Sequence, residues 1–203
     1  MTTINGYPLW DWMPDAIEGK ERWNLTSRVM NNSAGHSGIS YDSAAPVVGR
    51  SYTWSVEGWE NVEAMLDFLA TVKGRYGAFY IPTWRDDFIP TDYTWTDGVT
   101  LAFEPFGFPD VFRRLKRRRV AFINNGVVDV RAIRETGVDD DGNEYLYSDD
   151  GFERPMVNRN TIISLCPLVR LTADAVEIEW RPHDAQADVT FNVTEVIAEA
   201  PVI

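Results

Sequence analysis

Few side chains in this sequence have the types and spacing that catalytic or metal-binding chemistry requires. The 203 residues include two histidines, His36 and His183, and a single cysteine, Cys166. Zinc sites repeat histidine or cysteine at short intervals, and the sequence has no such spacing. His36 lies in a loop near Ser33 and Ser37, but the glycine-flanked serine of a hydrolase is absent. The sequence therefore predicts a protein that is not an enzyme, with no catalytic residue, no metal and no cofactor.

The cysteine has a structural interpretation. Cys166 ends the apolar run 162–166, where we expect a buried and unreactive thiol. Because a single cysteine forms no internal disulfide, the fold is not expected to depend on an oxidising compartment.

The acidic stretch 139–144 invites comparison with a calcium-binding loop. If Gly142 were the sixth residue of such a loop, its first and twelfth residues would be Gly137 and Ser148. The loop needs Asp and Glu at those two positions. We therefore expect a solvated turn in this stretch.

Carbohydrate chemistry supplies an alternative function from another class. Glycosidases use a pair of carboxylates, but no spacing among the 31 Asp and Glu residues singles out a pair. The chain also contains eight tryptophans, and indole rings in loops can stack on sugars. The platforms of such a carbohydrate-binding or carbohydrate-cleaving β-sandwich module would be Trp10, Trp12, Trp84 or Trp95.

Positive charge is concentrated in one basic run. Six of the seven residues from Arg113 to Arg119 are Lys or Arg, although the chain has a net charge of −12. The run could be a nucleic-acid patch, a solvated edge that prevents strand aggregation, or a contact with an acidic surface of the same or a neighbouring chain. We favour the last two. The expected interface residues of the run are Arg113, Arg114, Lys116, Arg117, Arg118 and Arg119.

The overall charge and hydropathy limit the expected partners. A net charge of −12 repels phosphate backbones and anionic lipids, so we expect neither nucleic acid nor a membrane as a partner. No apolar stretch approaches the 18 residues of a spanning helix. The first residues lack the basic and apolar regions of a signal peptide. The hydrophobic content of 44% is ordinary for a folded globular protein.

One segment has the periodicity of an amphipathic helix. Residues 60–73 carry apolar side chains at i, i+3, i+4, i+7 and i+10, and Gly74 follows where a C-terminal cap is expected. We expect this stripe to pack on a β-sheet and to be buried. Its members are Val62, Met65, Leu66, Leu69 and Val72.

Alternating apolar and polar residues predict strands elsewhere, and Asn124-Asn125-Gly126 predicts the turn of a hairpin. An acidic loop or protruding hairpin is expected at 135–153. The fold class is therefore mainly β: an antiparallel sandwich or barrel-like hub domain with one packing helix. We expect a single domain over 1–203, with an inserted β-rich module at about 85–155. The strands are expected at 23–26, 39–41, 51–56, 77–84, 99–103, 120–123, 127–130, 176–180 and 189–194.

The N-terminal residues form an aromatic arm framed by Pro8 and Pro14. Because proline cannot donate a hydrogen bond to a central strand, the arm is expected at an edge or in an extended segment. Trp10 and Trp12 could then dock on a neighbouring subunit, and we include both among the expected interface residues. The other interpretation is that the arm plugs the core of its own domain.

Two blocks of the sequence resemble a known family. Residues 68–84, Phe-Leu-Ala-Thr-Val-Lys-Gly-Arg-Tyr-Gly-Ala-Phe-Tyr-Ile-Pro-Thr-Trp, run from the end of the expected helix through a Gly-Arg turn to an aromatic strand. This pattern resembles the distal tail proteins of long-tailed bacteriophages and gene transfer agents. The stretches 168–180 and 191–196 are similar to the terminal strands of those proteins. The region 85–160 lies outside the resemblance.

The resemblance implies a virion structural protein of a phage tail tip, assembled in the host cytoplasm. Such proteins are β-rich hub domains that form a ring, here expected to be a hexamer. The ring joins the tail tube to the distal tip or baseplate and its fibres. The implied partners are further copies of this chain, the tail tube, tail-tip hub proteins and tail fibres.

Overall fold

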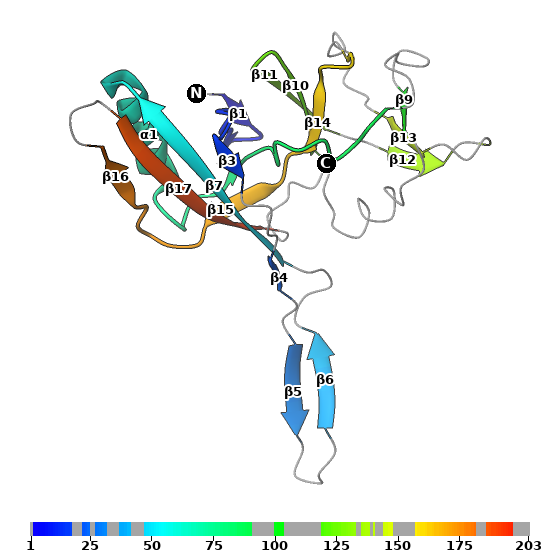
Figure 1. Cartoon of the computed structure of the whole chain (residues 1–203). Helices are drawn as coiled ribbons and strands as arrows, with labels where there is room; N and C mark the ends of the chain where they lie inside the picture. The colour runs from blue at the N-terminus through cyan, green and yellow to red at the C-terminus, as the bar shows by residue number, and fades with distance from the viewer. Residues whose placement is uncertain are drawn as a thin grey trace.

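The structure is a computed structural model. It describes residues 2–17, 22–24, 27–31, 37–41, 47–90, 100–103, 119–132, 135–138, 140, 144–147, 157–181 and 186–196. These residues are mainly in antiparallel strands and include one helix, which confirms the fold class expected from the sequence (Figure 1).

The main sheet is built around two long strands. β7 (Val47–Glu57) and β17 (Gln186–Glu195) pair antiparallel from Glu57 opposite Gln186 to Gly49 opposite Thr194. Shorter strands flank this pair, and the sheet curls into a half-barrel. β3 (Ala16–Ile17) and β4 (Arg22–Asn24) pair with β7, while β15 (Leu168–Leu171) and β16 (Ile178–Trp180) pair with β17, and β8 (Phe79–Tyr80) pairs with β15.

Alternation along the two central strands gives the sheet one apolar and one polar face. The alternation predicted for 51–56 is confirmed, because Tyr52, Trp54 and Val56 are all buried. On β17 the residues opposite them in the register are also buried, including Val189 and Phe191. The apolar face therefore carries the core, and the intervening residues form the opposite, polar face.

The helix α1 (Trp59–Val72) covers the apolar face. Val62, Met65 and Val72 are buried as expected, but Leu66 is 43% exposed and Leu69 is half-buried. The expectation for Leu66 was wrong because the helix is rotated toward Phe68. The Phe68 ring is buried and packs at 4.4 Å from the Trp10 ring and 5.1 Å from the Phe79 ring, between ring centroids.

The helix ends in left-handed backbone. Lys73 and Gly74 have φ values of 51° and 64°, and the Lys73 N–H donates to the Leu69 carbonyl at 3.0 Å. Gly74 thus lies in the left-handed conformation expected for a helix cap.

The N-terminal arm plugs the core of its own domain. A small ribbon of β1 (Thr3–Ile4) and β2 (Tyr7–Pro8) leads to the buried residues Leu9 and Trp10. The backbone N–H of Trp10 donates to the Tyr80 carbonyl at 2.9 Å, which fixes the arm beside β8. Of the two interpretations of the arm, the structure shows the plug.

A second sheet is formed by the expected hairpin and one further strand. β10 (Arg119–Asn124) and β11 (Val127–Ala132) are joined by Asn125 and Gly126, both with positive φ, as a two-residue hairpin turn requires. β10 also pairs with β14 (Ile162–Leu165), which runs directly into β15 of the main sheet. Residues 162–171 therefore connect the two sheets.

Two smaller units complete the described chain. β9 (Thr100–Phe103), β12 (Glu135–Val138) and β13 (Glu144–Tyr147) form a three-stranded sheet, so the stretch 135–153 contains a hairpin. β5 (Ser27–Asn31) and β6 (Ser37–Tyr41) form a two-stranded ribbon, which projects away from the rest of the molecule (Figure 1).

Candidate interaction site

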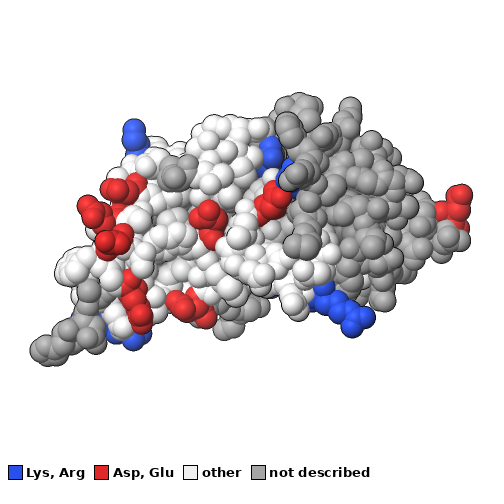
Figure 2. Space-filling model, turned by 90° about the horizontal axis from the view of Figure 1, so that it is seen from above, with Lys and Arg blue, Asp and Glu red and all other residues white. Residues whose placement is uncertain are grey.

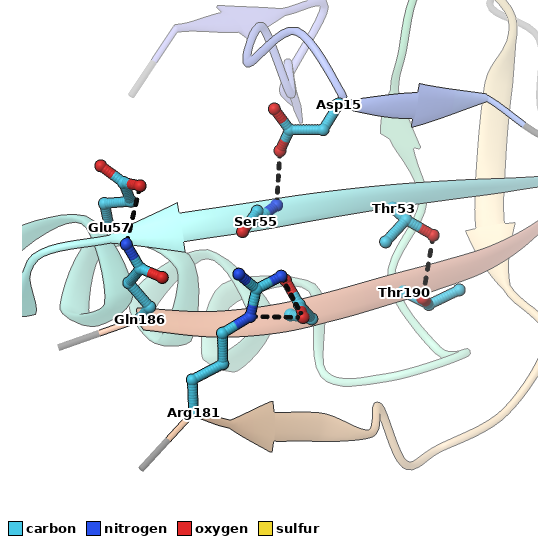
Figure 3. Close-up of polar contacts among 8 residues, drawn as sticks. Asp15, Thr53, Ser55, Glu57, Arg181, Gln186 and Thr190 are labelled. Carbon is cyan, nitrogen blue, oxygen red and sulfur yellow. Dashed lines mark hydrogen bonds and ion pairs between the residues drawn. The ribbon is translucent and has the colours of Figure 1, made fainter. Parts of the chain in front are cut away.

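A row of polar contacts crosses the polar face of the main sheet (Figure 3). The hydroxyls of Thr53 and Thr190 lie 3.0 Å apart across β7 and β17. At the end of these strands, the Gln186 amide donates to the Glu57 carboxylate at 2.8 Å. The Ser55 N–H donates to the Asp15 carboxylate, which brings the N-terminal segment onto the same face. These contacts hold in place the elements that surround a trough of about 390 Å³.

The trough is predominantly acidic. The Arg181 guanidinium binds Asp188 through Nε at 3.0 Å and through a second nitrogen at 2.8 Å. This pair and a hydrogen bond with Ser55 hold the pKa of Asp188 below its usual value. The carboxylates of Glu177 and Glu179 also line the trough. The one guanidinium is already paired with Asp188, so the trough as a whole attracts cations.

A buried junction links the two sheets. The Arg119 guanidinium lies over the Tyr80 ring, 5.2 Å from its centroid, and the Cys166 N–H donates to the Arg119 carbonyl at 3.0 Å. Burial raises the pKa of the Cys166 thiol and of the Tyr80 hydroxyl, with Arg119 opposing the shift in both. Cys166 is buried, as expected from the sequence, and its raised pKa favours the protonated thiol.

The exposed apolar surface includes a pair of tryptophans in contact. Trp59 begins α1 and is 68% exposed, and Trp180 ends β16 and is 49% exposed. Their ring centroids are 5.4 Å apart with an interplanar angle of 34°. Leu66, also exposed, lies two helical turns along α1 from Trp59. We name Trp59, Leu66 and Trp180 the aromatic patch.

Exposed carboxylates lie on the helix that carries Trp59 and Leu66. Glu60 and Glu63 are exposed on α1, and Glu63 is four residues from Trp59, so the two share a helix face. Glu57 and Glu179 lie at the same end of the main sheet, but on its polar face. Figure 2 shows carboxylates gathered at the end of the molecule that carries α1 and β16. The patch therefore combines aromatic rings with negative charge.

Several residues singled out from the sequence lie elsewhere than expected. Trp10 is 3% exposed and packs between the rings of Trp54, Phe68 and Phe191, so its side chain is not available to a partner. Trp12 is half-buried against Trp10. These rings fill the interior because an antiparallel half-barrel with one covering helix has room for large side chains on its apolar face.

The structure describes only some of the proposed sugar platforms and one residue of the basic run. Trp10 and Trp84 are buried and cannot serve as stacking platforms. Arg119 is half-buried at the junction over Tyr80. The other residues singled out from the sequence lie outside the described residues: Trp95, Arg113, Arg114, Lys116, Arg117, Arg118, and the two histidines for which no catalytic role was expected, His36 and His183.

The aromatic patch was not predicted from the sequence. Trp180 ends the strand expected at 176–180, where it shares a side with Val176 and Ile178 and alternates with Glu177 and Glu179, a pattern that indicates burial. The available signal was Trp59, because a large aromatic residue at the first position of a helix precedes the first turn of the stripe and is easily left uncovered. Its contact with Trp180 depends on β16 pairing with β17, which no local pattern specifies.

Comparison with known proteins adds no assignment. Neither a scan against protein-family models nor a search of curated proteins finds a match to this chain. Within the described ranges, no group of three or more His, Cys, Asp or Glu side chains is placed to hold a metal ion. In the same part of the chain, α1 is too short and too polar to cross a membrane.

Proposed function

We propose that this chain is a structural subunit of a phage tail tip, which assembles with copies of itself into a ring and with neighbouring tail proteins. The observation that supports this proposal is the projecting ribbon of β5 and β6. A separate support is the sequence resemblance of residues 68–84, 168–180 and 191–196 to distal tail proteins. The proposed function requires no catalytic step.

The ribbon calls for a partner on physical grounds. Among the described strands, β5 and β6 pair only with each other. A two-stranded hairpin alone in water is marginally stable at best, and both of its outer edges offer unpaired backbone groups. The register places Val29 opposite Ile39 and Ser27 opposite Tyr41, so this face of the ribbon carries both apolar and polar residue types. A neighbouring subunit that covers this face or adds a strand to an edge would stabilise the ribbon.

The ribbon can be removed by a conservative design. Asn24 of β4 and Val47 of β7 are opposite each other in the antiparallel register. Residues 25–46 can therefore be replaced by Asn-Gly, the two-residue turn that antiparallel neighbours accept. A matched surface control is Val127→Ser, which changes an exposed apolar side chain in the hairpin of β10 and β11.

The test compares the mass of the three proteins in solution and their incorporation into purified virions. We expect the unaltered chain to form an oligomer of fixed size and to be present at the tail tip. The 25–46 replacement should melt cooperatively with its β-sheet intact but fail to assemble, whereas Val127→Ser should assemble normally. A strictly monomeric wild-type chain that is absent from virions would refute the proposal.

A further inference from the structure

We propose that the aromatic patch is the acceptor for the basic run, residues 113–118, of a second copy of this chain. This inference rests on the proposed assembly and identifies one of its contacts. It combines two independent observations: two exposed indole rings in contact, and the exposed carboxylates of Glu60 and Glu63 on the helix that begins at Trp59.

The chemistry of the patch fits arginine. A guanidinium stacks on the face of an indole ring, and tryptophan is the best aromatic partner for such a cation. Glu63 lies one turn from Trp59 on the same face of α1, so a guanidinium stacked on Trp59 has a carboxylate within reach. The chain already uses this pairing in its interior, where Arg119 lies over the Tyr80 ring.

The size of the patch fits a short segment. At the observed exposures, and with about 250 Å² for a whole side chain, the two tryptophans present roughly 300 Å² of surface. A stable contact between folded domains buries about 800 Å² on each partner. The patch is therefore better matched to a few residues of an extended segment, whose binding would add to the other contacts of a ring.

The arrangement of the sheet favours a second copy over the same chain. Along β17, Trp180 is paired at Ala187 and Val169 is paired at Glu195. These two pairing positions are eight residues apart, which is about 26 Å along the strand. Arg119 is hydrogen-bonded to Cys166, on the far side of Val169 from Trp180. The junction that holds Arg119 is therefore remote along the sheet from the aromatic patch of the same copy, and a second copy is the occupant that we propose.

The binding test uses a peptide of residues 111–120, acetylated and amidated, titrated into the full-length chain by calorimetry at low salt. We expect weak, salt-sensitive binding that falls at least about tenfold in the double variant Trp59→Ser/Trp180→Ser. The matched control is Tyr76→Ser, because Tyr76 is 77% exposed beyond the other end of α1 and should leave binding unchanged. A peptide with every Arg replaced by Lys should bind several-fold more weakly.

The outcomes separate this inference from the proposed function. Equal peptide binding by the wild type and the double variant, or no binding by the wild type, would overturn the inference. A double variant that forms the wild-type oligomer would also overturn it, while the assembly proposal would stand. Peptide binding at the patch without any oligomer of the full chain would refute the ring instead. If maltohexaose or chitohexaose binds to the wild type but not to the double variant, and the peptide does not bind, the inference is overturned and the ligand of the aromatic patch is a sugar.

Discussion

Truncation of Trp10 to alanine tests whether the N-terminal arm is a plug or a docking element. The side chain is almost fully buried and has four aromatic neighbours, with ring centroids between 4.4 Å and 5.7 Å from its own. Burying roughly 200 Å² at about 25 cal/mol per Å² gives about 5 kcal/mol. Measured losses for large aromatic residues truncated in cores are about 3–5 kcal/mol. We expect Trp10→Ala to lose about 4 kcal/mol of the free energy of unfolding.

The loss is measurable by urea unfolding followed by far-ultraviolet circular dichroism. For a chain of this size, about 4 kcal/mol corresponds to a fall in the melting temperature of about 8–16 °C. Trp10→Phe should lose less, because it keeps an aromatic ring and removes an indole N–H that has no hydrogen-bond partner among the described residues. Trp59→Ala is the control, and as a surface change it should lose little.

The result that would refute the reasoning is specific. If Trp10→Ala unfolds within about 1 kcal/mol of the wild type but no longer assembles, the residue is a docking group and the plug is wrong. If stability falls as expected, any loss of assembly follows from unfolding and is not evidence of a contact made by Trp10.

Three other changes have clear expected outcomes. Gly77→Ala should lower the free energy of unfolding by about 1–3 kcal/mol, measured in urea, because the added Cβ would lie 2.2 Å from the Val72 carbonyl oxygen; wild-type stability would show that this turn relaxes freely. Cys166 should react with iodoacetamide only on unfolding, because burial raises its pKa, and rapid alkylation of the native chain would contradict the buried junction. Asp188 has a lowered pKa in the folded state, so its contribution to stability is present above the unfolded pKa of about 3.9 and is lost as the pH falls through the folded value. Asp188→Asn should therefore show a shallower loss of stability below about pH 4 than the wild type, and identical acid unfolding curves would remove Arg181 as the cause.

The elements that local pattern specifies were predicted from the sequence, and those that depend on distant pairing were not. Two apolar runs around Asn125-Gly126 gave a hairpin with the expected turn, and alternation at Tyr52 and Trp54 gave the correct buried face. The helix bounds were predicted within one residue at each end. The rotation of the helix about its axis was not predicted, because it depends on the contact of Phe68 with Trp10, a residue of the distant N-terminal arm.

The segment 77–84 shows why a good β pattern can fail. A strand was expected throughout, but only Phe79 and Tyr80 are in β8. Beyond them the backbone leaves the main sheet, and the Thr83 N–H donates to the Leu165 carbonyl at 2.8 Å beside β14. Tertiary contacts determine which of the two neighbouring sheets the backbone joins, and the local sequence of the segment does not specify it.

The candidate site was less predictable than the fold. The predicted interface residue Trp10 was aromatic and near the N-terminus, which describes a core plug as well as a docking arm. The aromatic patch depends on β16 bringing Trp180 to the start of α1, and these two elements are far apart in the sequence. Exposure is a property of the assembled sheet, so composition and periodicity could not distinguish the exposed tryptophans from the buried ones.

The pairing of β7 with β17 has a consequence for how the chain folds. Glu57 and Gln186 are partners across 129 residues, and Thr53 and Thr190 across 137. Translation proceeds at about 5–20 residues per second, so β7 waits roughly 7–26 s on the ribosome for the strand that completes the sheet. Pairing over such separations is slow to form because the intervening loop must close first. During this interval the apolar face of β7 has no β17 beside it, and binding by a chaperone at that stage would keep nascent chains from joining edge to edge before each sheet is closed.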